Sequence, residues 1–160
     1  MTPEDKIHKD LVTRFPSLAG KIRVPRVRRI FADVAPEQFG EVFEYAVKDA
    51  GFTILCTITG LDQGSTLAAL YHMAQESGIM LTLEVAVPKE APVLQTVSRQ
   101  FPAADAYERE MVDLLGMQVQ GLPPGSRYPL PDGWPEGQYP LRKDWKPEEA
   151  EKPTAEAKEK

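Results

Sequence analysis

The densest cluster of side chains that could do chemistry lies in the run ADAYEREMVD, which begins at Ala104. Carboxylates are common general acids and bases, so the directions in which these point decide whether they could act together. The run is predicted to lie on a helix from about Ala103 to Leu115, stopped by Gly116. Glu108 and Glu110 are two positions apart and would point roughly 200° away from each other on that helix. They cannot form a catalytic pair, which disfavours a small hydrolase built on this helix.

A charged ladder follows one face of the same helix, because Asp105, Arg109 and Asp113 are spaced four residues apart. Such a ladder is typical of a solvated helix face. The alternative is a helix held at a subunit boundary, with Glu108 and Arg109 bridging to another chain. Spacing alone favours the solvated face and leaves the second interpretation open.

Residue types that carry metals or nucleophilic catalysis are sparse. The sequence has one cysteine, Cys56, and two histidines, His8 and His72, and it has no Cys-x-x-Cys spacing or glycine-rich phosphate loop. An iron–sulfur cluster usually needs about four thiolates. We expect both histidines to be structural, and Cys56, which alternates with Ile54 and Ile58, to be a small core residue. The sequence therefore predicts no catalytic residue, no metal site and no cofactor-binding site in this chain.

The net charge of the chain and the length of its apolar runs exclude further classes of protein. The 160 residues carry a net charge of -5 with a pI of about 5.1, so non-specific binding to nucleic acid or to anionic lipid is not expected. The run Lys21–Arg29 has five basic residues in nine, which we interpret as a solvated, partly partner-facing strand edge, with an anionic ligand site as the alternative. The apolar runs are far shorter than the roughly 20 residues that cross a bilayer. A soluble, intracellular protein is expected.

Residues 1–116 are predicted to form an α+β domain. Three strands joined by short turns indicate an antiparallel meander, and the predicted fold class is an antiparallel sheet with helices on one face. The expected elements, in order, are a helix capped by Thr2 and ended by Pro16, a strand from about Val24 to Val34, a helix between Pro36 and Gly51, strands beginning near Phe52, Leu67 and Ile79, a short helix opened by Pro92, and the helix of 103–115.

The segment after the last helix has a different composition. Seven prolines and five glycines occupy twelve of the 32 positions from Gly116 to Pro147, without any apolar period. The segment is nevertheless too rich in Trp, Tyr and Leu for a solvated linker. We predict that residues 117–147 form an extended partner-docking arm, hereafter the arm, whose Trp134, Tyr139 and Trp145 pack on another protein. The charged residues 148–160 are predicted to be a disordered tail.

Two motifs in the last third of the chain resemble the 30-kDa subunit family of respiratory NADH:quinone oxidoreductase. The family has an aromatic-Glu-Arg-Glu helix, a Gly-rich return and a closing Pro-Leu-Arg-Lys-Asp-aromatic motif. The corresponding residues here are Tyr107, Glu108, Arg109, Glu110, Asp113, Gly116, Gly121, Pro140, Leu141, Arg142, Lys143, Asp144 and Trp145. With the order of α and β elements included, the resemblance covers about Phe31 to Trp145.

The sequence departs from the respiratory form after the helix. Where that form usually has G-H-P-D-L-R-R-I-L, this chain has the run GLPPGSRYPL from Gly121 to Leu130, without the histidine and one arginine. The run from Leu130 to Asp144 is more similar to the homologous subunit of energy-converting, membrane-associated nickel–iron hydrogenases. The hydrogenase type is favoured, and the quinone-reducing type stays open.

The resemblance implies a non-catalytic structural subunit of the hydrophilic arm of a redox complex, which supports electron transfer without an active site of its own. Its partners would be a large catalytic subunit and a small cluster-bearing subunit, which would hold the iron–sulfur clusters and any nickel–iron centre. The complex would place the chain on the cytoplasmic side of the membrane, in contact with the membrane only through its partners. The expected partner interface consists of Tyr107, Glu108, Arg109, Glu110, Asp113, Trp134, Tyr139, Leu141, Arg142, Lys143, Asp144 and Trp145, with Arg142 and Lys143 anchoring the arm to an acidic surface.

A free-standing protein-binding module that presents a proline-rich aromatic arm is the alternative, because extended proline segments are recognised by aromatic-lined grooves.

We predict that the full chain, purified alone, contains no iron, nickel or flavin. The reason is the scarcity of thiolate and imidazole ligands described above. Elemental analysis and an absorbance spectrum test this, and stoichiometric iron with a visible absorbance band would contradict it.

Overall fold

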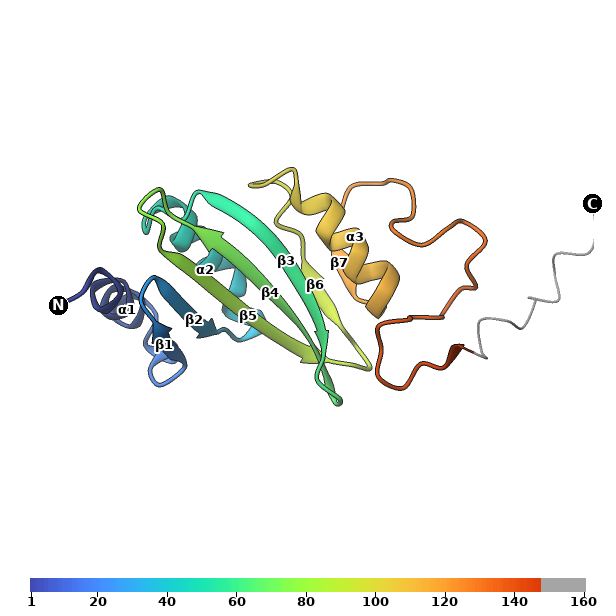
Figure 1. Ribbon diagram of the computed structural model, residues 1–160, viewed down its shortest axis with the longest axis horizontal. Helices are drawn as coiled ribbons and strands as arrows, with labels where there is room; N and C mark the ends of the chain where they lie inside the picture. Colours follow the sequence, from blue (N-terminus) through green and yellow to red (C-terminus); the bar gives the residue numbers. More distant parts are fainter. Residues whose placement is uncertain (148–160) are drawn as a thin grey trace, which may run out of the picture. The chain divides into compact units, whose positions relative to one another are not determined.

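The computed structural model describes residues 1–147, and the predicted tail of residues 148–160 lies outside the described residues. Three α-helices, one short 3-10 helix and seven strands make up this part of the chain (Figure 1). The elements are α1 (Pro3–Arg14), η1 (Pro16–Leu18), β1 (Ile22–Arg26), β2 (Arg29–Asp33), α2 (Pro36–Lys48), β3 (Ile54–Asp62), β4 (Thr66–Ala74), β5 (Met80–Pro88), β6 (Val93–Gln95), α3 (Ala104–Leu115) and β7 (Gln118–Gln120). None of the helices in these residues is long and apolar enough to span a membrane.

The chain divides into two compact units. The first consists of residues 1–59 and 68–87, and the second of residues 60–67 together with 88–147 of the described chain. Strands β3 and β4 belong mainly to the first unit, and the turn between them belongs to the second. The arm shares the second unit with α3.

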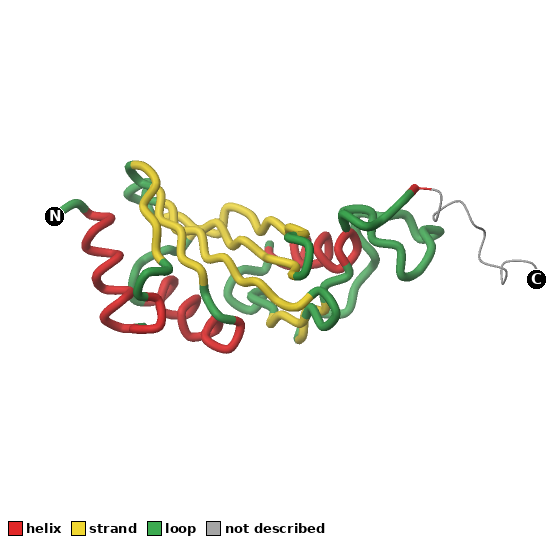
Figure 2. Tube along the Cα trace, turned by 90° about the horizontal axis from the view of Figure 1, so that it is seen from below, coloured by secondary structure: helices red, strands yellow, loops and turns green. Residues whose placement is uncertain are grey.

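The five-stranded sheet has the order β1-β2-β5-β4-β3. Strands β3, β4 and β5 are neighbours joined by short turns, so they run antiparallel, as the predicted meander requires. The α+β class is confirmed, and α1 and α2 lie on one face of the sheet (Figure 2). One pairing departs from the predicted antiparallel sheet, because β2 and β5 run parallel, with Ile30 opposite Leu81. The intervening helix α2 makes this parallel pairing possible, since it carries the chain back to the starting end of the sheet.

The predicted strand from Val24 to Val34 is in fact a hairpin of β1 and β2. The chain reverses at Val27 and Arg28, where Arg28 has a positive φ of 60°. The Glu4 carboxylate of α1 accepts the Arg28 N–H at 2.6 Å, which holds this turn. A turn without Gly, Asn or Asp gives no sequence signal, and for that reason the two strands looked like one.

The core of the first unit lies between α2 and the sheet. Pro36 sits in the first turn of α2, where a missing N–H costs no helical bond, and the apolar positions of this helix recur at helical spacing. Phe39 and Phe43 are 3% and 1% exposed and pack on Tyr71 of β4, with ring centroids 4.5 and 5.8 Å from the Tyr71 ring. The strongest periodic signal in the sequence therefore marks the main core helix.

The alternation predicted for β3 is only partly right. Ile58 is buried and so is the preceding Phe52, but Ile54 is 46% exposed and Cys56 is exposed. The prediction that Cys56 is a core residue is therefore wrong. Strand β3 is at the end of the strand order, and a side chain of an edge strand has a neighbouring strand on one side only.

A small parallel sheet of β6 and β7 replaces the short helix expected after Pro92. Val93 pairs with Gln118 and Gln95 with Gln120 across this sheet. Short apolar runs do not distinguish helix from strand, and the pairing partner lies more than twenty residues further along the chain. This is a contact that local pattern cannot predict.

We predict that Phe43→Ala lowers the free energy of unfolding by about 3–5 kcal/mol, because it empties a fully buried aromatic position. The exposed Glu41→Ala on the same helix should change it by about 0.5 kcal/mol or less. Urea denaturation of the two full-length variants tests this. Equal midpoints for both would show that α2 does not carry the core.

Candidate functional site

The candidate site is the C-terminal part of the arm. Hydrogen bonds to the last carbonyls of α3 hold this part of the arm on its own unit. The Leu141 N–H donates to the Leu114 carbonyl of α3 at 3.0 Å. Arg142 Nε donates to the Leu115 carbonyl at 2.7 Å, and its guanidinium lies over the Tyr139 ring at 4.6 Å from the centroid. Arg142 therefore satisfies the carboxyl end of α3, whose last carbonyls have no partner within the helix. The prediction that Arg142 and Lys143 anchor the arm to an acidic partner surface stays a prediction.

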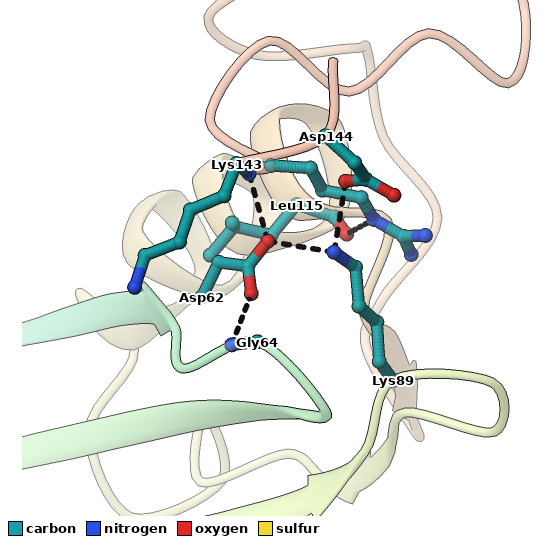
Figure 3. Close-up of polar contacts among 7 residues, drawn as sticks. Asp62, Gly64, Lys89, Leu115, Lys143 and Asp144 are labelled. Atoms are coloured by element: carbon teal, nitrogen blue, oxygen red, sulfur yellow. Dashed lines mark hydrogen bonds and ion pairs between the residues drawn. The ribbon is translucent and has the colours of Figure 1, made fainter.

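A buried carboxylate at the end of β3 fixes the same segment (Figure 3). The Asp62 side chain is 1% exposed and accepts Lys89 Nζ and the Lys143 N–H, each at 2.8 Å, on one oxygen. Its other oxygen accepts the Gly64 N–H at 2.8 Å. Lys89 also bonds Asp144 at 2.8 Å, so one lysine joins a buried and an exposed carboxylate. We call Asp62, Gly64, Lys89, Lys143 and Asp144 the Asp62 cluster.

These contacts set the charge states in the Asp62 cluster. Burial alone would raise the pKa of Asp62, but the hydrogen bonds from Lys89, Lys143 N–H and Gly64 N–H outweigh it and lower the pKa from 3.8 to about 2. Hydrogen bonds to Asp144 and Asp62 raise the pKa of Lys89. The bond from Lys89 in turn lowers the pKa of Asp144. The charged forms are stabilised throughout, so the cluster is an ion-pair network at neutral pH.

Gly116 makes the close approach of the arm to α3 possible. It ends the helix in the left-handed conformation, with φ of 72°, which favours glycine. A Cβ at this position would also stand 2.5 Å from the Tyr139 ring. Both the left-handed end of the helix and the packing of the Tyr139 ring against this position therefore require glycine here.

A second attachment holds the middle of the arm. Asp113 of α3 is 7% exposed and accepts Arg127 Nε at 2.6 Å and the Leu130 N–H at 2.9 Å. Arg127 Nη1 also donates to the Trp134 carbonyl at 2.8 Å. Asp113 thus belongs to an internal bridge between helix and arm.

Arg109 forms only half of the predicted ladder. Its Nε and Nη2 bind both oxygens of Asp105 at 2.8 and 2.9 Å, and Nη2 also donates to the Pro123 carbonyl of the arm. Asp113, the third member of the ladder, pairs with Arg127 instead. The helix face is therefore covered by the arm and is not a free solvated surface.

Glu108 is buried, at 0% exposed, and serves the interior of the second unit. Its oxygens accept the Val97 N–H at 2.7 Å and the Thr96 hydroxyl at 2.5 Å. Burial raises the pKa of this carboxyl, and the two hydrogen bonds oppose the rise. These contacts fix the chain after β6 to α3 and give Glu108 a structural role in place of the expected bridge to another chain.

The aromatic side chains of the arm are half-buried within their own unit. The Trp134 and Trp145 rings lie 6.0 Å apart, and their indole N–H groups donate to the carbonyl and the side-chain oxygen of Gln138, each at 2.9 Å. Tyr139 packs at Gly116. These rings therefore pack partly within their own unit, because the arm folds back on itself and on α3. The expectation that they also pack on another protein stays a prediction.

Other predicted interface residues point outward. Leu141 is 54% exposed, the Asp144 side chain is 70% exposed, and Glu110 and Lys143 are exposed, while Tyr107 is half-exposed.

Asp62 and Lys89 were not predicted as functional residues. An aspartate within an apolar strand and just before a turn is the signal that could have drawn attention to Asp62. Among the described residues no group of three or more His, Cys, Asp or Glu side chains could hold a metal ion.

A family model for the respiratory-chain NADH dehydrogenase 30 Kd subunit matches residues 32–151. The chain belongs to this family. Among its relatives, the membrane-bound hydrogenase subunit beta of Pyrococcus furiosus is 30% identical over 93% of this chain and 91% of its own length. A subunit of the F(420)H(2) dehydrogenase of Methanosarcina mazei is 32% identical over 87% of this chain and 89% of its own.

The 30 Kd subunit fold is also seen among solved structures. A chain of the membrane-bound sulfane sulfur reductase, an archaeal respiratory membrane complex, superposes with a TM-score of 0.78 at 26% identity, over 91% of this chain and 86% of its own. The resemblance stated from the sequence is confirmed, for both the respiratory and the hydrogenase relatives.

We predict that the Asp62 cluster makes stability depend on pH in acid. Because the folded pKa of Asp62 is lowered to about 2, its contribution is complete above pH 4 and is lost as the pH falls toward 2. The lost stability is roughly 2 kcal/mol, at 1.36 kcal/mol for each unit of pKa shift. Asp62→Asn should be less stable than wild type at pH 7 and should lack this component.

Urea denaturation at pH 7, 4 and 2.5 measures the effect, with the exposed arm residue Asp132→Asn as the control. If wild type and Asp62→Asn lost stability in parallel between pH 4 and 2.5, the buried ion-pair network would not be the source.

Proposed function

We propose that this member of the 30 Kd subunit family is a non-catalytic structural subunit of a membrane-associated redox complex, of the energy-converting hydrogenase or the NADH:quinone oxidoreductase type. Its arm docks on the catalytic large subunit. The observation that carries the proposal is Leu141, whose backbone is fixed to α3 while its side chain is 54% exposed. The family match and the named relatives, which are subunits of such complexes, support the subunit role.

Attachment of the arm to its own unit changes how docking would work. A loose arm loses conformational entropy when it binds, whereas a segment already held by the Asp62 cluster and by Arg142 loses little. The arm therefore holds its binding conformation before a partner binds. Preorganisation of this kind raises affinity without adding contacts.

The proposed contact surface differs from the sequence-based one. It keeps the outward-facing residues Tyr107, Glu110, Leu141, Lys143 and Asp144, and the partly exposed rings of Trp134, Tyr139 and Trp145. It leaves out Glu108 and Asp113, which are buried, and Arg142, which caps α3. An exposed leucine beside half-exposed aromatics and charged rim residues has the composition of a protein–protein interface.

Catalysis and electron transfer in the assembled complex are assigned to the partner subunits. The iron–sulfur clusters, and nickel–iron where present, lie in the large and small subunits, and this chain supports their arrangement on the cytoplasmic side. The scarcity of thiolates and imidazoles in the sequence favours this division. The free-standing module with an extended proline-rich ligand is less favoured, because the arm is tied to α3 at Asp113, Leu114 and Leu115.

We predict that Leu141→Ala weakens association with the large subunit by about 1.5–2 kcal/mol, roughly tenfold to thirtyfold, because a buried leucine contributes about that much. The melting temperature of the full chain alone should stay the same, since the side chain is exposed in it. Partner recovery with a tagged chain from native membranes, together with a thermal melt, measures both.

The matched control is Ile54→Ala, which truncates an apolar side chain of the same size that is 46% exposed and belongs to the first unit, whereas the arm belongs to the second. Full recovery of the large subunit with Leu141→Ala would contradict the proposal for the arm. A loss with Ile54→Ala equal to that with Leu141→Ala would show a general effect of apolar truncation instead.

A further inference from the structure

A basic segment of the chain, the run Lys21–Arg29, forms the β1–β2 hairpin. Four of its five cations are arginines. Strand β1 is the outermost strand of the five-stranded sheet, so only its inner side is paired with another strand (Figure 1). The hairpin belongs wholly to the first unit, whereas the arm belongs to the second. It is therefore a surface independent of the arm.

The hairpin keeps an excess of positive charge after the carboxylates that contact it are counted. Arg23 Nη2 lies 2.8 Å from Asp33 and 3.9 Å from Glu84, at the open end of the hairpin. Near the turn, Glu4 accepts the backbone N–H of Arg28. Within residues 1–147 the ion pairs of the hairpin cations all involve Arg23. Five cations meet three carboxylates, and the unbalanced charge lies at the turn end.

Arg26 and Arg29 face each other at this turn end. They are register partners across the two strands. Residues directly opposite each other have their side chains on the same face, with Cβ atoms about 4.5–5.5 Å apart. Arg29 donates Nη1 to the Arg28 carbonyl at 2.8 Å, and within the described part of the chain its Nε and Nη2 stay without an acceptor. Like charges in such a pair destabilise the two strands, so a carboxylate bound to both would remove that cost.

The pair lies on the face of the sheet that the helices leave open. Ile30 and Ala32 follow Arg29 along β2 at alternating positions, are 0% exposed, and face the core on the side of α1 and α2 (Figure 2). Arg29 is half-buried on the opposite face, and its partner Arg26 is exposed. An open surface of this kind suits a side chain of another protein, because a small ligand needs an enclosed pocket.

Exposed apolar side chains accompany the two arginines in the hairpin. Val24 is 40% exposed, and Val27, in the turn, is 79% exposed. Arginine beside exposed apolar residues has the composition of a protein–protein contact. Pro25 has no N–H, which makes the free edge of β1 a poor template for an added strand. A partner would therefore be held by the side chains of the hairpin.

We propose that Arg26 and Arg29 together bind an aspartate or glutamate side chain of a partner subunit. Guanidinium groups match a carboxylate in shape and in charge, with two parallel N–H donors each. An anionic membrane is less favoured as the source of negative charge, because a flat lipid surface over this face would also cover the carboxylates of Asp33 and Glu84. The inference rests on the proposed subunit function and adds a contact that the arm does not make.

The charge reversal Arg26→Glu separates binding from folding. In the free chain it places opposite charges across the hairpin, so the melting temperature should stay the same or rise. In the complex it sets a carboxylate against the partner's carboxylate. Recovery of partner subunits from native membranes with a tagged full-length chain should therefore fall at least about tenfold.

The matched control is Lys9→Glu, which makes the same change in charge at an exposed position of α1 in the same unit and should leave recovery unchanged. Wild-type recovery with Arg26→Glu, while Leu141→Ala loses the partner, would overturn the hairpin proposal and leave the docking function of the arm standing. Wild-type recovery with both would overturn both. Equal losses with Arg26→Glu and Lys9→Glu, or a lower melting temperature of Arg26→Glu, would also overturn the hairpin proposal.

A second variant, Arg26→Lys, identifies the bound group directly in the assembled complex. It keeps the positive charge and supplies an amine that a carbodiimide couples to a carboxylate in contact with it. Mass spectrometry should then find position 26 joined to an aspartate or glutamate of a partner subunit. Coupling to a lipid carboxylate, coupling to this chain alone, or no coupling at position 26 would each overturn the proposal.

Discussion

A buried carboxylate at the end of a strand governs the second unit. Asp62 is charged although its side chain is 1% exposed, and such a charge is tolerated only when it is fully hydrogen-bonded and paired. Its donors come from the turn after β3, from Lys89 after β5, and from the backbone of Lys143 in the arm. Residues about eighty positions apart in the sequence must therefore meet for this unit to be stable. The arm is consequently part of the folded unit.

The remaining attachments of the arm use the carboxyl end and one side of α3. The carboxyl end of the helix offers free carbonyls at Leu114 and Leu115, which the arm satisfies through Leu141 and Arg142. Asp113 and Arg109 reach from the side of the helix to the middle and the start of the arm. The run ADAYEREMVD holds the densest cluster of side chains that could do chemistry, but in the structure its charged residues mainly hold the arm in position.

How far the sequence could predict each element follows from the range of the interactions. Helix α2 and strands β4 and β5 were predicted because their apolar periods reflect burial against one core. The β1–β2 turn, strand β6 and strand β7 were missed, since their formation depends on Glu4 or on a strand distant in the chain. Cys56 was misplaced because alternation marks which side chains share a face, without saying whether anything covers that face at the edge of the sheet.

By itself the sequence determined the fold class, the family resemblance, and the special character of the proline-rich arm with its Leu-Arg-Lys-Asp-Trp end. These features are local: period, composition and contiguous motif. Only the tertiary structure decided what the charged and aromatic residues of that motif do. Arg142 turns inward to a carbonyl, Lys143 contributes its backbone N–H to Asp62, and Leu141 is left facing outward. A motif determines which hydrogen-bonding groups are available. The partner of each group depends on which buried acceptors, distant in the sequence, the fold brings within hydrogen-bonding distance. Only the folded chain decides this.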